Sequence, residues 1–196
     1  MLAPRGDLPY HGRMRWTTFA ILLYLAAAMQ VAHLASLGGA AAYPRIEFLP
    51  LLAIFYALYA SEDAAPLTGL ACGLLYDICT PATVGLYAIP LALVAWAVLR
   101  IRMSIFREHV VSQVVITLLG IMSFGLLTGL FQYVVHLVLS NTGHLAGGDL
   151  PFPQLFKALA VNAFYSALIA PGLFYVLLRL EALTGFNQKG PRNRPN

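Results

Sequence analysis

Two acids, Glu47 and Asp77, are the residues best placed to do chemistry, because each lies within or at the edge of an apolar stretch. A carboxylate at mid-bilayer costs about 2.5–3.5 kcal/mol. Each acid is fifteen residues from Glu62, the centre of a polar turn, so an antiparallel hairpin would bring them level. Two level carboxylates repel unless a proton or cation joins them, and the guanidinium of nearby Arg45 can bridge both. The sequence therefore predicts a polar cluster of Arg45, Glu47 and Asp77; the alternative is that Asp77 is a solvated acid at a helix end.

Other polar side chains recur at helical spacing inside apolar stretches. They form three stripes: Gln30, His33 and Ser36; Thr128, Gln132, His136 and Ser140; and Asn162 with Ser166. Such stripes can line a polar pathway, but they carry no ionised partners. We interpret them as interhelical hydrogen bonding, which contributes about 0.6 kcal/mol per bond on average.

Motifs of catalysis and metal binding are absent from the sequence. It contains no HExxH, P-loop or GxSxG pattern, and Cys72 and Cys79 lack the CxxC spacing of a metal site. We therefore predict that the protein is not an enzyme and has no catalytic residue, metal site or cofactor.

The composition requires these residues to be held by membrane helices. Of the 196 residues, 60% are hydrophobic and 10% are charged, against about 45–50% and about 25% in soluble domains. So few polar side chains cannot cover a water-exposed surface, which excludes a soluble enzyme domain, a nucleic-acid binder and a disordered protein. The apolar stretches are too long for barrel strands. They predict an all-α integral membrane protein with six transmembrane helices, at about 16–37, 46–60, 62–79, 84–101, 110–139 and 155–180.

The positions of the basic residues predict the orientation. If six spans alternate, ten of the 12 Lys and Arg residues fall on one side, leaving only Arg45 and Lys157 on the other. The positive-inside rule then places both termini in the cytoplasm. We expect one transmembrane domain over 1–183, a short disordered cytoplasmic tail over 184–196, and an external loop over 140–154 whose role the sequence leaves open. The first stretch is longer than the ~7–15 apolar residues of a signal peptide, so we expect it to be retained.

Small residues spaced by four mark faces where helices can approach closely. They predict helix-packing or partner interfaces, formed by Ala65, Gly69 and Gly73, by Gly125 and Gly129, and by Ala28 and Ala32.

One segment carries a family resemblance. Gly69-x-x-x-Gly73-Leu74-Leu75-x-Asp77, followed by Gly85, resembles the rod shape-determining protein MreD family. Pro50 to Ala57 is similar to that family's second span, which opens near a proline and carries aromatic residues. Length, span count and a short basic tail agree over nearly the whole chain.

The resemblance implies a non-enzymatic scaffold of the bacterial cell-elongation machinery, which makes peptidoglycan, in the cytoplasmic (inner) membrane. The implied partners are an MreC-like bitopic protein and, through it, the SEDS glycosyltransferase RodA and a class B penicillin-binding protein. Membrane lipid is a further partner, and nucleic acid is not expected. The resemblance also implies a fold similar to the substrate-binding subunits of energy-coupling-factor transporters.

That fold similarity leaves a second function open, a vitamin-type binding subunit of such a transporter. Ala28 and Ala32 fit it, because those subunits dock their energising partner through small residues on the first span. The external loops, however, lack a cluster of charged or aromatic residues that could hold a ligand. A flippase or an intramembrane enzyme has only the polar stripes in its favour.

Overall fold

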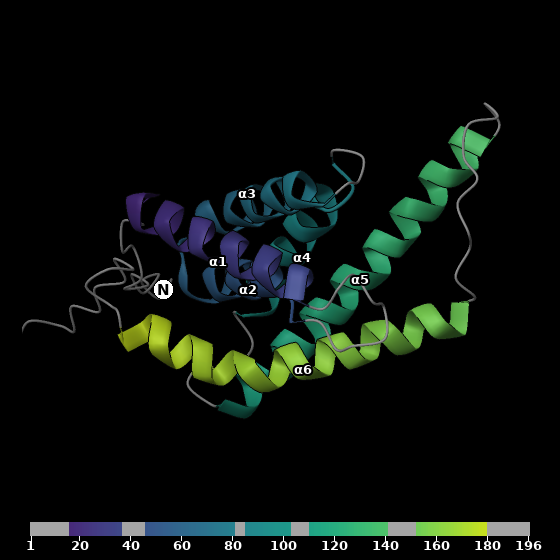
Figure 1. The fold of residues 1–196 in the computed structure, drawn as a ribbon. Helices are drawn as coiled ribbons and strands as arrows, with labels where there is room; N and C mark the ends of the chain where they lie inside the picture. The colour runs from purple at the N-terminus through teal and green to yellow at the C-terminus, as the bar shows by residue number, and fades with distance from the viewer. Residues whose placement is uncertain (1–15, 37–45, 81–84, 103–109, 141–151, 180–196) are drawn as a thin grey trace, which may run out of the picture.

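The structure, a computed structural model, describes residues 16–36, 46–80, 85–102, 110–140 and 152–179. Within these residues the chain forms six helices and no strand (Figure 1). The helices are α1 (Trp16–Ser36), α2 (Phe48–Tyr59), α3 (Ala64–Cys79), α4 (Ala88–Ile101), α5 (Val110–Ser140) and α6 (Phe152–Arg179). The all-helical class expected from the sequence is confirmed, and no helix end differs from its apolar stretch by more than four residues.

The helices fall into two length classes. α1, α5 and α6 have 21, 31 and 28 residues and are long and apolar enough to cross a membrane. α2, α3 and α4 are also apolar but have only 12, 16 and 14 residues. At a rise of about 1.5 Å per residue they measure about 18–24 Å, which is less than the ~30 Å hydrocarbon core of a bilayer.

Each short helix has a proline at its third position, namely Pro50, Pro66 and Pro90. The first four N–H groups of an α-helix have no partner inside the helix. Proline has no N–H to leave unpaired, and its fixed φ suits the first turn. The prolines therefore help to start these helices and remove one donor that an apolar medium would not satisfy.

α2 forms the centre of the bundle. Every residue from 49 to 58 is buried, and α2 contacts each of the other five helices. The ring of Phe55 lies 5.4 Å from that of Phe174 in α6, and the ring of Tyr56 lies 4.9 Å from that of Phe19 in α1. A helix that is apolar on every side is stable where neighbours cover every side, and α2 meets that condition.

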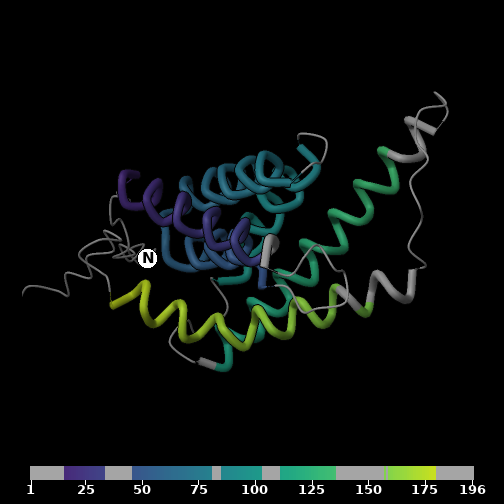
Figure 2. The backbone as a smooth tube through the Cα atoms, in the orientation of Figure 1, coloured from purple at the N-terminus to yellow at the C-terminus, as the bar shows by residue number. Residues whose placement is uncertain are grey.

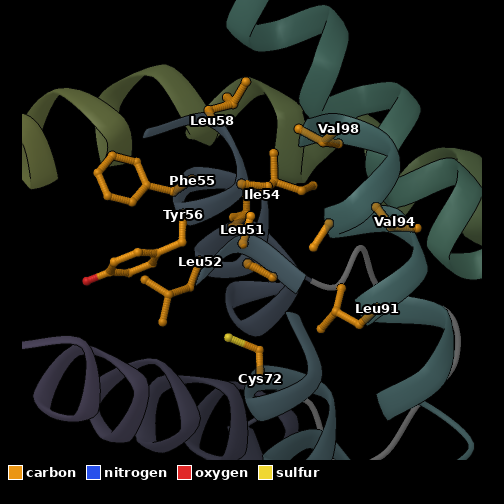
Figure 3. Close-up of a cluster of buried hydrophobic side chains, with 14 of the residues drawn as sticks. Leu51, Leu52, Ile54, Phe55, Tyr56, Leu58, Cys72, Leu91, Val94 and Val98 are labelled. Atoms are coloured by element: carbon orange, nitrogen blue, oxygen red, sulfur yellow. The ribbon is translucent and has the colours of Figure 1, made fainter. Parts of the chain in front are cut away.

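Figure 3 shows how the aliphatic part of this core is built. The side chains come from α2, α3 and α4 and belong to one buried cluster: Leu51, Leu52, Ile54, Leu58, Cys72, Leu91, Val94 and Val98. Because three short helices contribute to one cluster, none of them can be removed without exposing the others.

Two glycines set the contact between α3 and α4. A Cβ atom on Gly69 would lie 2.6 Å from the Cβ of Ala95 and 2.9 Å from the carbonyl oxygen of Leu91. A Cβ on Gly73 would collide with the Cα of Ala88. Both positions oppose backbone, which cannot move aside as a flexible side chain can, so the two helices are held closer than any larger residue would allow.

α5 and α6 form a longer pair whose outer parts leave the rest of the bundle. They meet where a Cβ on Gly125 would collide with the side chain of Leu159. Towards the segment that joins them, α5 and α6 diverge, and α5 extends beyond the ends of α1 to α4 (Figures 1 and 2). The molecule therefore has a compact part, to which all six described helices contribute, and a projecting arm formed by the outer parts of α5 and α6.

The close approach at Gly73 predicts a large effect from one methyl group. Gly73→Ala should lower the free energy of unfolding by about 1–3 kcal/mol, the usual cost of overpacking, because the new Cβ meets the backbone of α4. The measurement is thermal unfolding of the purified protein in mild detergent.

Gly172 of α6 supplies the matched control. Nothing lies within 4 Å of a Cβ built there, and alanine favours a helix over glycine by about 0.5–1 kcal/mol. Gly172→Ala should therefore leave stability unchanged or raise it. Equal stability of both variants would show that α3 and α4 do not meet at Gly73.

Candidate functional site

The start of α2 is the point where polar side chains from three helices converge. Residues 46–48, which lead into α2, carry N–H groups that α2 itself cannot satisfy. The N–H of residue 46 donates to Nε2 of His33 at 3.3 Å, that of residue 47 to Oγ of Ser166 at 3.1 Å, and that of residue 48 to Oε1 of Gln30 at 2.8 Å. The interpretation of Gln30, His33 and Ser166 as interhelical hydrogen-bonding residues is confirmed.

The side chain of Glu47 lies in the same place. It is only 9% exposed, and its Oε2 accepts hydrogen bonds from the hydroxyl of Tyr76 at 2.9 Å and from Nε2 of Gln30 at 3.5 Å. Burying a carboxylate is costly unless hydrogen bonds compensate for the lost water. Gln30 serves the start of α2 and the buried carboxylate at the same time, because its oxygen accepts from the backbone N–H of Phe48 and its nitrogen donates to Glu47.

Asp77 organises the start of α4. Its Oδ2 accepts from the N–H of Gly85 and its Oδ1 from the N–H of Tyr87, both at 2.8 Å. The turn needs a residue with positive φ, which Gly85 supplies at +98°, a conformation that glycine adopts without strain. Asp77 is 3% exposed, so this carboxylate acts as a buried cap that joins the end of α3 to the start of α4.

Three aromatic rings close the same region from the side of α5. Tyr76 and Tyr87 have ring centroids 4.5 Å apart, and Phe124 of α5 lies 6.0 Å from the first and 6.2 Å from the second. Such pairs add about 0.5–1.5 kcal/mol each beyond their buried area. The rings were not expected from the sequence, because Tyr76 and Tyr87 belong to no polar stripe and show only as aromatic residues near helix ends.

We refer to Gln30, His33, Glu47, Tyr76, Asp77 and Ser166 as the polar layer. From Glu47 to Ala60, the two residues that flank α2, and from the start of α3 at Ala64 to Asp77, the chain advances by thirteen residues, or about 20 Å. The polar layer therefore lies at one height in the bundle, about 20 Å from the opposite ends of α2 and α3.

The opposite end of α2 is capped by a buried arginine. Nη1 of Arg102, the residue that follows α4, donates to the carbonyl oxygens of Ala57 at 3.2 Å, Leu58 at 3.5 Å and Ala60 at 2.6 Å. A cation at this position complements the negative end of the helix dipole. From the sequence, Arg102 is only one of the basic residues between the fourth and fifth spans. Its position relative to other residues does not indicate that its side chain turns inward.

Some of the predicted small residues pack against other helices of this chain, and others are exposed. Ala65, Gly69, Gly73 and Gly125 are buried in contacts within the chain, and Gly129 is half-buried. Ala28 and Ala32 are exposed on α1. Only these two of the seven predicted residues are thus fully available to a partner.

The predicted cluster of Arg45, Glu47 and Asp77 stays a prediction. Arg45 lies outside the described residues. Glu47 and Asp77 bind different groups, the first bonding to side chains of α1 and α3 and the second to the backbone before α4. Tyr76, the neighbour of Asp77, makes the contact with Glu47 across the hairpin.

The polar layer has the chemistry of a set of caps. Its side chains bond to the N–H groups at the beginnings of α2 and α4 and to one another. Within the described part of the chain, no three His, Cys, Asp or Glu side chains come together in a way that could hold a metal ion. The arrangement therefore fixes the positions of helices.

The comparison with known families decides what kind of protein this is. A family model described as rod shape-determining protein MreD matches residues 11–180, which include all six helices. The chain belongs to the MreD family. It is therefore a membrane protein with a role in rod-shape determination, from a family of shape-determining structural proteins. No curated protein and no solved structure gives a significant match, so the similarity to transporter subunits, and the transporter function that depends on it, have no support.

The cap formed by Asp77 in this MreD protein can be measured. Asp77→Ala removes both acceptors at the start of α4 and should lower the free energy of unfolding by about 1.5–3 kcal/mol, as expected for hydrogen bonds to a charged group. Asp77→Asn keeps one side-chain oxygen and should lose less. The measurement is thermal unfolding in detergent.

Asp63 is the matched control, because it precedes α3 in the cap position but is exposed and makes no side-chain cap hydrogen bond. Asp63→Ala should change stability little. A loss at Asp63 as large as that at Asp77 would contradict the role of Asp77 as a cap.

Proposed function

We propose that this MreD-family protein is a non-enzymatic scaffold in the cytoplasmic (inner) membrane of a bacterium. It binds the transmembrane helix of an MreC-like bitopic shape protein. Through that protein it associates with a RodA-type SEDS glycosyltransferase and a class B penicillin-binding protein. Residues 1–183 form one multi-pass domain, both termini are cytoplasmic, and 184–196 form a short tail. Membership of a shape-determining family supports this role.

The observation that carries the proposal is a free face on α1. Ile21, Tyr24, Leu25, Ala28 and Ala32 are all exposed, and their spacing places them along one side of the helix. We call this set the α1 outer face. Small residues such as Ala28 and Ala32 let a second transmembrane helix approach closely, and close packing is the main source of helix association in lipid.

Most of the other predicted small residues are already used inside the bundle, which supports this assignment. The glycines of α3 oppose α4, and Gly125 of α5 opposes α6, so those small residues already hold the bundle together. Ala28 and Ala32 are exposed and have no such role within the described part of the chain. A face with small residues that the fold does not use is what a scaffold needs to bind another membrane protein.

Enlarging the α1 outer face should weaken partner binding without unfolding the protein. Ala28→Leu and Ala32→Leu each place a bulky side chain between the two helices. We expect either change to reduce co-purification of the MreC-like protein from detergent-solubilised membranes at least several-fold. Rescue of rod shape in cells depleted of the native protein should fall in parallel.

Ala97→Leu is the control for these two changes. Ala97 is also a small exposed residue in a helix, but it lies on α4. This variant should retain co-purification and rod shape. Full binding by the Ala28 and Ala32 variants, with thermal stability unchanged, would show that the partner does not use α1.

Aromatic and basic side chains support the proposed orientation. The guanidinium of Arg100 lies 5.2 Å from the ring centre of Trp96 at the end of α4, and that of Arg179 lies 5.9 Å from the ring centre of Tyr175 at the end of α6. Such pairs are typical of the membrane interface, where aromatic rings gather and where basic residues mark the cytoplasmic side. Because α4 and α6 both end there, this end of the bundle is the cytoplasmic one in the proposal.

Reporter fusions test the orientation. Alkaline phosphatase, which is active only outside the cytoplasm, should be inactive when fused after Asn196 and active when inserted within 143–148. A cytoplasm-active reporter should give the opposite pattern at both sites. An active C-terminal phosphatase fusion would refute the proposed topology.

A further inference from the structure

The apolar surface of α3 and α4 is much shorter than that of α5. Exposed large apolar side chains run over 67–78 on α3 and 89–101 on α4, or about 17 and 18 Å at about 1.5 Å per residue. On α5 they run over 111–134, or about 35 Å. A bilayer core of ~30 Å is matched by the surface of α5 and exceeds that of α3 and α4 by more than 10 Å.

Polar groups bound the short surface at both ends. Glu62 and Asp63 are exposed before α3, and Arg100 is exposed near the end of α4. At the other end α3 stops at Cys79, and the chain turns at 85–87 into α4. Helix ends and charged groups are not tolerated beside acyl chains, so both ends of this surface favour the headgroup region.

The long surface continues past the height at which the short one stops. Phe124 of α5 contacts Tyr76 in the polar layer and the neighbouring ring of Tyr87. Beyond it, α5 continues for sixteen residues to Ser140, about 24 Å, with Leu126 still exposed. A bilayer of uniform thickness can fit the long surface of α5, which runs obliquely to α6 (Figure 1), by tilt, but it leaves the surface of α3 and α4 more than 10 Å too short.

We propose that the phospholipids beside α3 and α4 form a locally thinned bilayer, with headgroups at the height of the polar layer, while the bilayer beside α5 keeps its full thickness. Mismatch of this kind has a modest cost per ångström and is commonly met by thinning. Lipid fits the short surface better than a protein partner, because a transmembrane helix of ~20 residues would extend well beyond it. The proposal depends on membrane insertion and not on the scaffold role.

Tryptophan fluorescence can measure the two depths in one experiment. The chain has two tryptophans, Trp16 and Trp96, and changing both to Phe gives a silent background. Ile78→Trp then reports on the short surface and Leu126→Trp on the long one. These side chains are 76% and 45% exposed, so a larger ring can be accommodated at both.

The two reporters are matched in height. Each lies two residues beyond one of the rings of Tyr76 and Phe124, which are 6.0 Å apart. The full chain is reconstituted into phosphatidylcholine–phosphatidylglycerol vesicles that contain lipids brominated either near the headgroup or near the chain end. The ratio of quenching by the two lipids gives the depth of each tryptophan.

We expect the Ile78 reporter to be quenched at least twofold more by shallow than by deep bromine, and the Leu126 reporter to show the reverse. Equal depths would overturn the proposal, since a uniform bilayer predicts them. Loss of all quenching at Ile78 would also overturn it, because protein would then cover the short surface. If Ile78→Trp does not fold, Ile89→Trp on α4 takes its place. In a uniform bilayer that reporter would lie deeper than Leu126, so a shallower reading supports thinning and a deeper one overturns it.

Discussion

Backbone N–H groups that begin a helix inside an apolar medium must be given partners, and the bundle is arranged around that requirement. α2 and α4 begin about 20 Å from the far end of the short helices, and both beginnings are buried among other helices, where water cannot supply hydrogen bonds. Prolines in the first turns remove some of these donors. Acceptors for the others come from Gln30, His33 and Ser166 at α2 and from Asp77 at α4. Each partner comes from another helix, so capping and helix placement are one process.

Patterns that repeat along the chain could be predicted from the sequence. The apolar stretches gave the six helices to within four residues, and the spacing of Gly69 and Gly73 indicated a face for close packing; in the structure the residues opposite both glycines belong to the start and middle of the α4 segment. Both follow from helical periodicity, which is a local property. The same logic found Gln30 and Ser166 as polar residues on helix faces without saying what they bind.

Contacts that depend on the fold could not be predicted in this way. Arg102 reads as a loop cation, yet it turns inward to the carbonyl end of a helix more than forty residues earlier. The hairpin count drew attention to Asp77 and Glu47, whereas the side chain that reaches Glu47 is the neighbouring Tyr76. A difference of one residue rotates a helical side chain by about 100°. The register of a hairpin therefore does not determine which residue of one helix faces the other helix.

The central position of α2 has a consequence for biosynthesis. Twelve apolar residues are fewer than the ~17–25 that normally make a span, so α2 is a weak insertion signal by itself. Its covering includes Phe174, and the N–H of Glu47, just before its first turn, bonds to Ser166. Both partners belong to α6, the last of the described helices. Because chains emerge from the N-terminus, α2 must wait, partly uncovered, until more than a hundred further residues have been made. Newly inserted chains therefore pass through a vulnerable interval in which membrane chaperones and proteases can act on the unfinished core.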